Sequence, residues 1–531
     1  MSIHWADINA DKIIREKGDK ARYTCASGIT PSGTVHVGNF REIISVDLVV
    51  RALRDKGHEV RFLYSWDDYD VFRKVPSNVR DREQFESYLR WPITMVPDPA
   101  GTHESFARAN EAELEGRLAE VGITPEYIYQ AHRYRAATYA EGIRAALERR
   151  EEIREILNRF RTSPLPAEWW PVSVFSRFTN KDTTTIVGWD GEWGLTYRCE
   201  DTGQEDTIDL RETGYAKLPW RIDWPMRWAY EQVDFEPAGK DHHSEGGSFD
   251  TARHVAQEIY NWQPPVTFQY DFISIKGRGG KMSSSSGEVI SLRDVLEIYQ
   301  PEVVRYLFAG TRPNSEFAIS FDLDVIKIYE DYDKCERIYF GQESVNEKRA
   351  AKERRIYELS QVEAPPRSLP AQIPFRHLCN LLLIHDGAVD AALADMPGFS
   401  EMDEDLQRRA RQRARGAWNW VQEFAPEEFR FHVVDPSTTQ PRELSAAELQ
   451  AVGELRDMVR SGIAELSDKE VQNGIYDVAR SAGLEPKDLF QTLYFILIGQ
   501  EQGPRLGGFL KTLGAERVLG ILERYGTQDN G

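Results

Sequence analysis

The stretch SGITPSGTVHVGNF, from Ser27 to Phe40, places three glycines and a proline between a β-prone segment and a helix-like pattern. The β-prone run is Arg22 to Cys25, and from Val37 apolar residues recur at helical spacing until Gly57. EVRFLYSW, Glu59 to Trp66, is typical of a second strand. Strand, glycine turn, helix and strand form a βαβ unit, which predicts a parallel sheet. Ligands of such sheets bind beyond the carboxyl ends of the strands, where both the glycine turn and the following SWDDYD lie.

The remaining sequence predicts further modules, because 531 residues are too many for one ordinary hydrophobic core. Residues 83–215 alternate charged helical stretches with loops and look inserted. An extended run, Pro264 to Ile275, leads into the turn KGRGGKMSSSSG and another helical stretch. From about Ile326 onward strand signals nearly vanish. The predicted fold is α/β: a Rossmann-like parallel-sheet catalytic domain, an inserted connective module and an all-α C-terminal domain.

Composition excludes some classes of protein. The start lacks a basic segment followed by an apolar run, and no apolar run approaches the roughly 18 residues of a membrane-spanning helix. We therefore expect a cytoplasmic protein without a membrane partner. The four cysteines are widely scattered, which favours reduced thiols. The net charge of −20 disfavours a polyanionic partner on average, but RRARQRARGAW, Arg408 to Trp418, is a local basic block. It suits either a nucleic-acid contact or a solvated helix face.

Two glycine turns nearly match the phosphate-loop pattern, in which two glycines five apart precede a lysine and then serine or threonine. Thr34 follows Gly33 where the lysine belongs, and Met282 follows Lys281 where serine or threonine belongs. A Walker-type hydrolase is therefore disfavoured. A helix N-terminus still binds anions through unpaired N–H groups and its dipole. His36 and Asn39 can donate to phosphate there, although an ordinary helix start would explain His36 equally well.

The second turn carries Lys281 as a point charge and three serine hydroxyls, Ser283 to Ser285, among glycines that permit movement. A mobile cationic loop suits a reaction in which charge builds up on a phosphate. Phosphoryl or nucleotidyl transfer is such a reaction, because the protein mainly positions the reactants and stabilises charge. The alternative interpretation is a flexible serine linker.

These motifs resemble a known family. PSGTVHVGN, Pro31 to Asn39, resembles the HIGH signature of class I aminoacyl-tRNA synthetases, and KMSSS, Lys281 to Ser285, resembles their KMSKS signature. More narrowly, SGITPSGTVHVGNFREI, WDDYDVFRKVP, KLPWRIDWPMRW, EPAGKDH and GGSFDTA are similar to the class I lysyl-tRNA synthetases. The similarity runs from about residue 4 into the C-terminal GPRLGGFL.

The resemblance implies a reaction in which lysine joins ATP with release of pyrophosphate, and the acyl group then passes to the terminal adenosine of tRNA. It implies His36, Asn39 and Lys281 as catalytic residues and Mg²⁺ as a companion of ATP. Ser284 departs from the signature, since a second lysine is usual there. The ATP-binding residues implied are Pro31, Gly33, His36, Gly38, Asn39, Gly239, Asp241, Lys281, Met282, Ser283 and Ser284.

A lysine pocket needs an apolar slot for the methylenes and a carboxylate or aromatic face for the ammonium. WRIDWPMRW, Trp220 to Trp228, offers both, although tryptophans at spacings of four could equally be core. Asp223 is one candidate for the charge partner. Such a pocket discriminates strongly against neutral analogues, so we expect no editing site. The family places its amino acid at the positions of Gly28, Thr30, Trp220, Asp223, His242 and Tyr270.

Two further features have alternative interpretations. The carboxylates Asp67, Asp68 and Asp70 could orient the substrate amine or Mg²⁺, or could be buried structural acceptors. SRFTNKDTTT and YRCEDTG lie where many relatives carry Cys-x-x-Cys knuckles, but here Ser176, Thr179 and Thr202 accompany the single Cys199. One thiolate cannot make a tetrahedral zinc site. Unless DHH, residues 241–243, is a ligand cluster, we expect no structural zinc and no other metal ligands.

The resemblance also implies a division into domains. Residues 1–90 and 216–290 would form the catalytic domain, 91–215 an acceptor-binding insert with the degenerate knuckle, 291–340 a stem-contact linker, and 341–531 the helical anticodon-binding domain. Arg411, Arg413 and Arg415, interleaved with Trp418 and Trp420, suit phosphate neutralisation and base stacking. Arg411, Arg415 and Trp418 are the tRNA-binding candidates.

The sequence thus predicts a monomeric, ATP-dependent ligase that charges tRNA(Lys) with L-lysine. A glutamyl or glutaminyl enzyme is the nearest alternative, but its pocket would need a cation for the substrate carboxylate. A tRNA-binding paralogue without catalysis is another, motivated by Ser284. A small-molecule nucleotidyltransferase would leave the helical C-terminal domain unexplained.

Overall fold

The computed structural model describes residues 4–76, 79–212, 214–276 and 289–526. Two compact units divide the chain. Unit 1 comprises residues 1–296, 301–319 and 334–367, and unit 2 comprises 297–300, 320–333 and 368–531. Each unit is described by itself.

Unit 1 is built on a parallel sheet. Strand β1 (Arg22–Ile29) pairs in parallel with β2 (Glu59–Trp66), and β2 pairs in parallel with β3 (Glu126–Tyr129). On the other side of β1, Cys25 and Val266 each form a parallel bridge with Phe235, and β9 (Ala238–Gly239) pairs in parallel with β10 (Gln269–Tyr270). The spatial order of segments therefore reverses direction at β1, which is the topological switch point of a doubly wound sheet.

The predicted βαβ unit is confirmed. Helix α2 (Val37–Asp55) joins β1 to β2 and packs on both strands; other helices of unit 1 cover it as well, so residues all around α2 are buried. Strand β1 continues beyond the predicted run to Ile29. The extended run expected over residues 264–275 holds β10 and the start of a second short strand, β11 (Ile273–Lys276). The Rossmann-like α/β architecture predicted from the sequence is the observed one.

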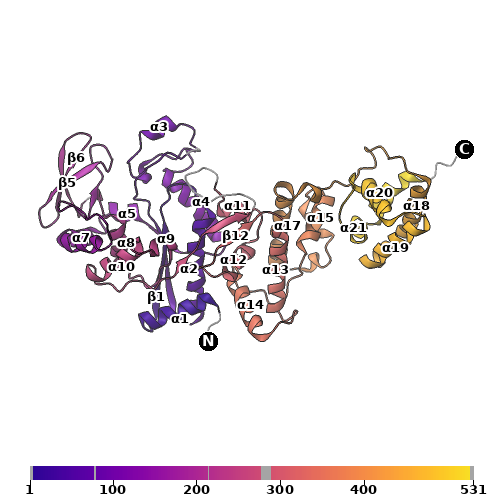
Figure 1. Cartoon of the computed structure of the whole chain (residues 1–531), viewed down its shortest axis with the longest axis horizontal. Helices are drawn as coiled ribbons and strands as arrows, with labels where there is room; N and C mark the ends of the chain where they lie inside the picture. The colour runs from indigo at the N-terminus through magenta and orange to yellow at the C-terminus, as the bar shows by residue number, and fades with distance from the viewer. Residues whose placement is uncertain (1–3, 77–78, 213, 277–288, 527–531) are drawn as a thin grey trace. The chain divides into compact units, whose positions relative to one another are not determined.

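The remaining elements of unit 1 surround this sheet (Figure 1). An antiparallel sheet of order β5-β6-β7 and the pair β4-β8 lie between β3 and α8 in the sequence. The helices are α1 (Trp5–Lys17), α3 (Arg82–Glu86), α4 (Phe106–Glu120), α5 (Gln130–Arg135), α6 (Ala140–Glu148), α7 (Arg150–Asn158), α8 (Trp220–Glu231), α9 (Lys240–His243), α10 (Ser248–Glu258), α11 (Leu292–Leu296), α12 (Pro301–Gly310) and α14 (Glu347–Ser360). The strands are β4 (Ser173–Val174), β5 (Thr184–Trp189), β6 (Gly194–Cys199), β7 (Glu205–Asp209), β8 (Ala216–Lys217) and β12 (Phe317–Ser320).

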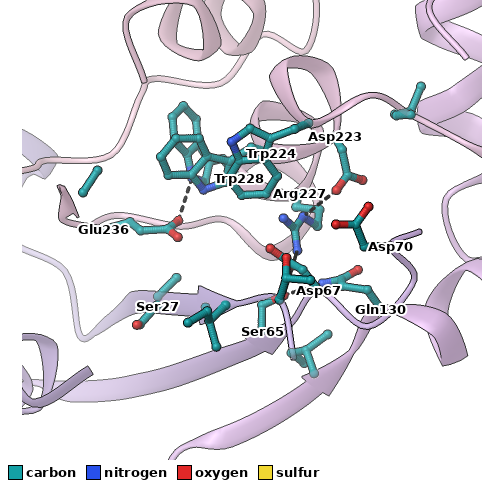
Figure 2. A pocket seen from close by; sticks show the side chains of 18 of the residues that line it. Ser27, Ser65, Asp67, Asp70, Gln130, Asp223, Trp224, Arg227, Trp228 and Glu236 are labelled. Carbon is teal, nitrogen blue, oxygen red and sulfur yellow. Dashed lines mark hydrogen bonds and ion pairs between the residues drawn. The ribbon is translucent and has the colours of Figure 1, made fainter. Parts of the chain in front are cut away.

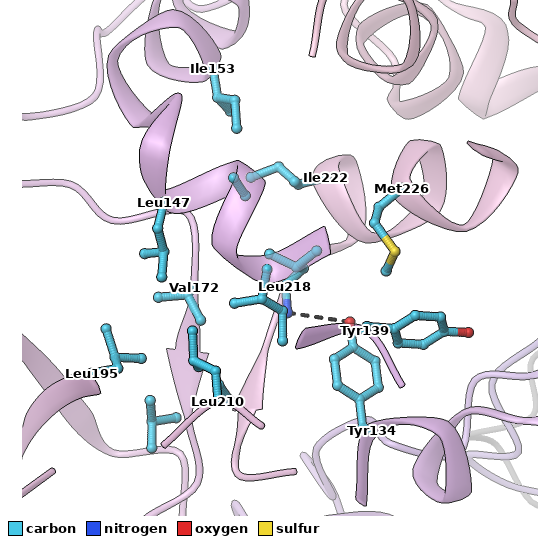
Figure 3. Packing of buried hydrophobic residues seen from close by; sticks show 14 of the residues in the cluster. Tyr134, Tyr139, Leu147, Ile153, Val172, Leu195, Leu210, Leu218, Ile222 and Met226 are labelled. Atoms are coloured by element: carbon cyan, nitrogen blue, oxygen red, sulfur yellow. Dashed lines mark hydrogen bonds between the residues drawn. The ribbon is translucent and has the colours of Figure 1, made fainter. Parts of the chain in front are cut away.

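Helix α8 connects two hydrophobic clusters of unit 1. Residues four apart share one face of a helix, so three such sets divide its surface. Ile222 and Met226 pack into the cluster beneath the antiparallel sheet, together with Leu147, Val172, Leu195 and Leu210 (Figure 3). Trp224 and Trp228 pack with Leu63 and Phe249 beside the parallel sheet. The third set, Asp223 and Arg227, is polar although both residues are buried.

Unit 2 is helical, as the sequence predicts from about Ile326 onward, and no strand follows β12 among the described residues. Ser445 with Glu448, and Ser467 with Glu470, form capping boxes that satisfy N–H groups at helix starts. The helices are α13 (Asp324–Tyr339), which ends in unit 1, α15 (Phe375–Ile384), α16 (Val389–Ala394), α17 (Glu404–Glu423), α18 (Ala446–Arg460), α19 (Asp468–Ser481), α20 (Pro486–Ile498), α21 (Leu506–Leu513) and α22 (Ala515–Leu522).

None of the described helices is long and apolar enough to cross a bilayer.

Candidate functional site

A cavity of about 710 Å³ opens at the carboxyl ends of the parallel strands, at the switch point. Ser27 and Gly28 of β1 and Ser65 of β2 line its floor, and α8 lines its opposite wall (Figure 2). Gly28 is required there, because a β-carbon would lie 2.7 Å from the Ser65 carbonyl oxygen. The close approach of β1 and β2 keeps the floor of the cavity narrow.

Arg227 organises the polar wall of this cavity (Figure 2). Its Nη1 donates to Asp67 Oδ1 at 2.6 Å and to Ser65 Oγ at 2.7 Å, and its Nε lies 3.3 Å from Asp223 Oδ2. The guanidinium also stacks over Trp220, 5.2 Å from the ring centroid. Burial opposes the charge, but Asp67 and Asp223 outweigh it and raise the pKa of Arg227. Arg227, Asp67 and Asp223 therefore form a charged triad held inside the wall.

Two other carboxylates of the cavity have no cation within ion-pair distance among the described residues. Glu42 on α2 accepts hydrogen bonds from Ser27 Oγ at 2.8 Å, from Gly28 N at 3.2 Å and from the Tyr270 hydroxyl. Glu236 accepts from Trp228 Nε1 at 2.7 Å. Burial raises the pKa of Glu42. Burial and the nearby Glu42 charge raise that of Glu236 to about 7.

This arrangement has a chemical consequence. A buried carboxylate without a counter-charge is destabilised, and a ligand ammonium that enters beside it removes that penalty. The aromatic wall of Trp220 and Trp224, whose rings stack at 4.7 Å, offers an apolar surface to the rest of such a ligand. The cavity is therefore suited to a small molecule that combines amines with methylenes.

The six residues predicted to bind the amino acid all line this cavity: Gly28, Thr30, Trp220, Asp223, His242 and Tyr270. Their contacts differ. Tyr270 donates to Glu42, and His242 Nδ1 lies 2.5 Å from Ser248 Oγ. Asp223 already pairs with Arg227 and accepts from the Tyr134 hydroxyl, so its charge is balanced within the protein. The tryptophans could be pocket wall or hydrophobic core, and the structure shows both. Trp224 and Trp228 are buried, whereas Trp220 is 37% exposed, and all three line the cavity.

The three aspartates that follow β2, Asp67, Asp68 and Asp70, differ in their contacts. Asp68 is buried and accepts from Ala131 N at 2.7 Å, which is a structural role; burial raises its pKa to about 6. Asp67 belongs to the charged triad. Asp70 lies 3.6 Å from Lys217 Nζ and 3.1 Å from Arg73 Nη2 at the edge of the cavity. Asp67 and Asp70 line the cavity, and Asp68 does not.

The glycine turn and the start of α2 lie beside the cavity. Asn39, in the first turn of α2, lines it. His36 is the N-cap residue of this 19-residue helix, and the Val37 amide donates to the Ile290 carbonyl at 2.8 Å, which fixes the helix start. Pro31 and Gly33 are buried within the turn, and Gly38 is half-buried. The helix start lies next to the cavity, where the dipole of α2 favours a negative charge.

The other predicted ATP contacts lie in two places. Gly239 ends β9, where an added β-carbon would lie 3.5 Å from the Tyr270 ring, and Asp241 is exposed on the short α9. Lys281, Met282, Ser283 and Ser284 lie outside the described residues.

The knuckle-like positions converge in space. Thr179 Oγ1 lies 3.9 Å from Cys199 Sγ. Burial disfavours the Cys199 thiolate, but hydrogen bonds from Ser176, Thr202 and Thr179 outweigh it and lower the thiol pKa to about 7. Four side chains thus surround one centre with a single sulfur among them. The described residues contain no group of three or more His, Cys, Asp or Glu side chains arranged to hold a metal ion, DHH included.

The basic block of α17 in unit 2 is partly core. Arg413 is buried, where it donates to both Asp333 oxygens at 2.6 and 3.0 Å, and Trp420 is fully buried. Neither side chain is available to a nucleic acid. Arg411 pairs with Asp390 at 2.9 Å, Trp418 packs against Gly387, and Arg415 is exposed. Arginines two positions apart on a helix lie on nearly opposite faces, so Arg413 faces away from Arg411 and Arg415. This explains why Arg413 is buried while Arg415 is exposed.

The parallel sheet, with a cavity at its switch point and the start of α2 beside it, defines a Rossmann-like α/β protein with a candidate ligand site at the carboxyl ends of its strands. A family model described as tRNA synthetases class I (K) matches residues 3–363. The chain belongs to this family.

Individual relatives agree. The chain is 53% identical over 528 residues to the lysine–tRNA ligase of Treponema pallidum (strain Nichols), covering 99% of each. It is 41% identical over 534 residues to the lysine–tRNA ligase of Pyrococcus horikoshii, covering 99% of this chain and 100% of the relative. A solved glutamate tRNA ligase from Elizabethkingia meningosepticum aligns over 96% of this chain and 99% of its own, with 15% sequence identity and a TM-score of 0.42, values too low to support a conclusion.

Sequence reasoning missed several residues of the cavity. Glu42, Gln130, Arg227 and Glu236 were not singled out, although each lines it. Two of them had a signal: Glu42 follows Asn39 by three residues on the same helix face, and Arg227 follows Asp223 by four. Glu236 had none, because its position depends on the sheet order.

Proposed function

We propose that this protein attaches lysine to tRNA in an ATP-dependent reaction through a lysyl-adenylate. The observation that carries the proposal is a pair of carboxylates, the half-buried Glu42 and the buried Glu236, without a cationic partner among the described residues, in a cavity next to the start of α2. Lysine carries two ammonium groups joined by methylenes, which suits two uncompensated carboxylates and a tryptophan wall. Glutamate would require a free cation, and Arg227 is already held by Asp67 and Asp223.

In the first step, a carboxylate oxygen of lysine attacks the α-phosphorus of ATP, and the bond to the pyrophosphate oxygen breaks. The cavity holds the amine, so that the lysine carboxylate points toward the start of α2. There, His36 and Asn39 hold phosphate oxygens by donating to them, and the dipole of α2 favours the negative charge. Lys281 stabilises the charge that develops on the leaving pyrophosphate. Mg²⁺ would supply additional positive charge on the phosphates, and Asp70 is the carboxylate placed to help hold it.

In the second step, a ribose hydroxyl of the terminal adenosine of tRNA attacks the acyl carbonyl carbon, and AMP leaves with the electrons of the bond that joined it. Pro31, Gly33, Gly38, Gly239 and Asp241 shape the nucleotide site in this proposal, together with Met282, Ser283 and Ser284. Arg415 is an exposed cation of α17, and we assign it to tRNA contact. We further propose that the protein acts in the cytoplasm as a monomer.

The experiment that tests this function is amino-acid-dependent ATP–pyrophosphate exchange across the standard amino acids, with and without tRNA. We expect exchange with lysine alone, and a loss of about 100-fold or more in Lys281→Ala, because one charge-stabilising contact of the transition state is removed. If exchange occurs only with glutamate and only in the presence of tRNA, the substrate is glutamate rather than lysine. No exchange with any amino acid would overturn the enzymatic proposal.

The affinity for lysine should depend on pH. Lysine binding needs the ionised form of Glu236, whose pKa burial and the Glu42 charge raise to about 7, against a hydrogen bond from Trp228 and the charge of Arg227. A group with that pKa is about one-tenth ionised at pH 6 and nine-tenths at pH 8, so the dissociation constant should fall about tenfold over this range. Isothermal titration calorimetry at pH 6, 7 and 8 measures it. Glu236→Gln should flatten the dependence; an equally steep profile in that variant would contradict the assignment.

A further inference from the structure

A second cavity, of about 520 Å³, lies beside the first in unit 1. Its walls come from the end of α7 and the segment after it, from the start of α8 and from the start of α10. Pro219 and Trp220 line both cavities, so these two residues form the partition between them. Trp220 stacks on Trp224 toward the first cavity and is 37% exposed. Whatever occupies the second cavity therefore lies next to the amino-acid site.

Two arginines face this second cavity without a carboxylate within ion-pair distance among the described residues. Arg161 donates to the Ser163 carbonyl oxygen at 3.1 Å, and Arg221 donates to the Gly246 carbonyl oxygen and to Thr251 Oγ1, each at 2.8 Å. Desolvation and the charge of Arg161 lower the pKa of Arg221, which shows that the two guanidinium groups repel each other. An anionic ligand would relieve this repulsion.

The other walls are apolar and aromatic. Leu157 is buried, Phe160, Leu165 and Trp169 are half-buried, and Trp220 closes the side toward the first cavity. Guanidinium groups that meet phosphate and aromatic rings that stack on bases are the two components with which proteins hold single-stranded nucleic acid. A sugar or a carboxylic acid would not use both.

We propose that the second cavity receives the 3′-terminal nucleotides of tRNA during acyl transfer, with a backbone phosphate between Arg161 and Arg221 and a base against Trp169. The inference rests on the proposed function, because acyl transfer brings the terminal ribose to the carbonyl carbon held on the other side of Trp220. The ribose hydroxyl and the carbonyl carbon must approach within about 3–3.5 Å to react. The terminal ribose therefore has to reach the first cavity, while the nucleotides before it pass along Pro219 and Trp220.

The test separates the two reaction steps. Adenylate formation does not use the second cavity, so Arg161→Ala should keep lysine-dependent ATP–pyrophosphate exchange within about twofold of wild type. Transfer from preformed lysyl-adenylate to tRNA, measured in a single turnover, should slow at least tenfold. The matched control is Arg159→Ala, two residues away, whose guanidinium is already held by Glu258 at 2.8 Å. Arg221→Gln, which keeps a donor toward Thr251, is the second variant.

A binding measurement distinguishes the loss of a contact to the tRNA 3′ end from a general structural defect. Wild type should bind intact tRNA at least tenfold more tightly than tRNA that lacks its two 3′-terminal nucleotides, and Arg161→Ala should bind both equally. Equal discrimination in Arg161→Ala and Arg159→Ala would overturn the inference. A raised KM for ATP in the exchange reaction of Arg161→Ala would overturn it too, by making the second cavity part of the ATP site. If wild type fails to charge tRNA with lysine at all, the proposed function fails instead.

Discussion

Replacement of Glu42 by glutamine should raise the KM for lysine by roughly 30- to 5,000-fold while leaving the KM for ATP unchanged. Removing one partner of a desolvated, hydrogen-bonded charge pair costs about 2–5 kcal/mol, which is the origin of this range. Glutamine has nearly the same shape, but its amide nitrogen would face donors: Glu42 now accepts from Ser27, Gly28 and Tyr270. The substitution therefore removes the charge that meets the substrate amine and disturbs the donors around it.

Steady-state exchange kinetics at varied lysine measure the effect, and the free energy of unfolding measures any loss of stability. The matched control is Asp55→Asn at the end of the same helix, which removes a carboxylate that is 57% exposed and pairs with Arg355 at 2.9 Å. Its KM for lysine should equal that of wild type. If Glu42→Gln keeps the wild-type KM for lysine, the amine is recognised elsewhere in the cavity, and Glu236 becomes the primary candidate.

Most of the fold was predictable because it follows from local patterns. The βαβ unit could be identified from the apolar period of α2 and the β-prone runs on either side, since these preferences act within a few residues. The helical nature of unit 2 was predictable for the same reason. The five-segment order of the parallel sheet was not, because the Phe235 segment pairs with β1 across more than 200 intervening residues and the Val266 segment pairs in turn with the Phe235 segment.

The candidate site shows the same limit. Motif-based residues such as Gly28 and Asn39 were predictable, since the glycine turn and the start of α2 are contiguous in sequence. The charge partners of Asp67, Asp223 and Glu42 were not, because each depends on side chains from distant elements: Arg227 meets Asp67, and Tyr270 meets Glu42. Asp223 looked like a free carboxylate in the sequence and became half of an ion pair in the fold. The prediction that Arg413 of the basic block of α17 neutralises phosphate was wrong for a related reason, because its burial depends on an ion pair with Asp333.

The three faces of α8 explain why the amino-acid site lies where it does. Ile222 and Met226 anchor the helix to the cluster under the antiparallel sheet, and Trp224 and Trp228 anchor it to the parallel sheet. The remaining, polar face, Asp223 and Arg227, lines the cavity. Its position is thus fixed from two sides before any ligand binds, which preorganises Arg227 and the tryptophan wall.

The charged triad adds to this anchoring, so Arg227→Met should destabilise unit 1 by about 3–5 kcal/mol, the usual cost of leaving buried charges unpaired. Methionine fills a similar volume, and the loss would therefore come from the buried Asp223 and the half-buried Asp67, which would lose their cation. Hydrogen exchange of the α8 amides and the urea midpoint measure the effect.

The charge origin of this loss can be tested directly. Adding Asp67→Asn and Asp223→Asn to Arg227→Met removes the unpaired charges and should restore most of the stability, because a neutral set of similar shape replaces the triad. Arg117→Met is the matched control: its partner Glu120 lies in the same helix with 45% of its side chain exposed, and such surface pairs contribute about 0–1 kcal/mol. If the triple variant is no more stable than Arg227→Met, then α8 is held by the packing of the Arg227 side chain against Trp220 rather than by its charge.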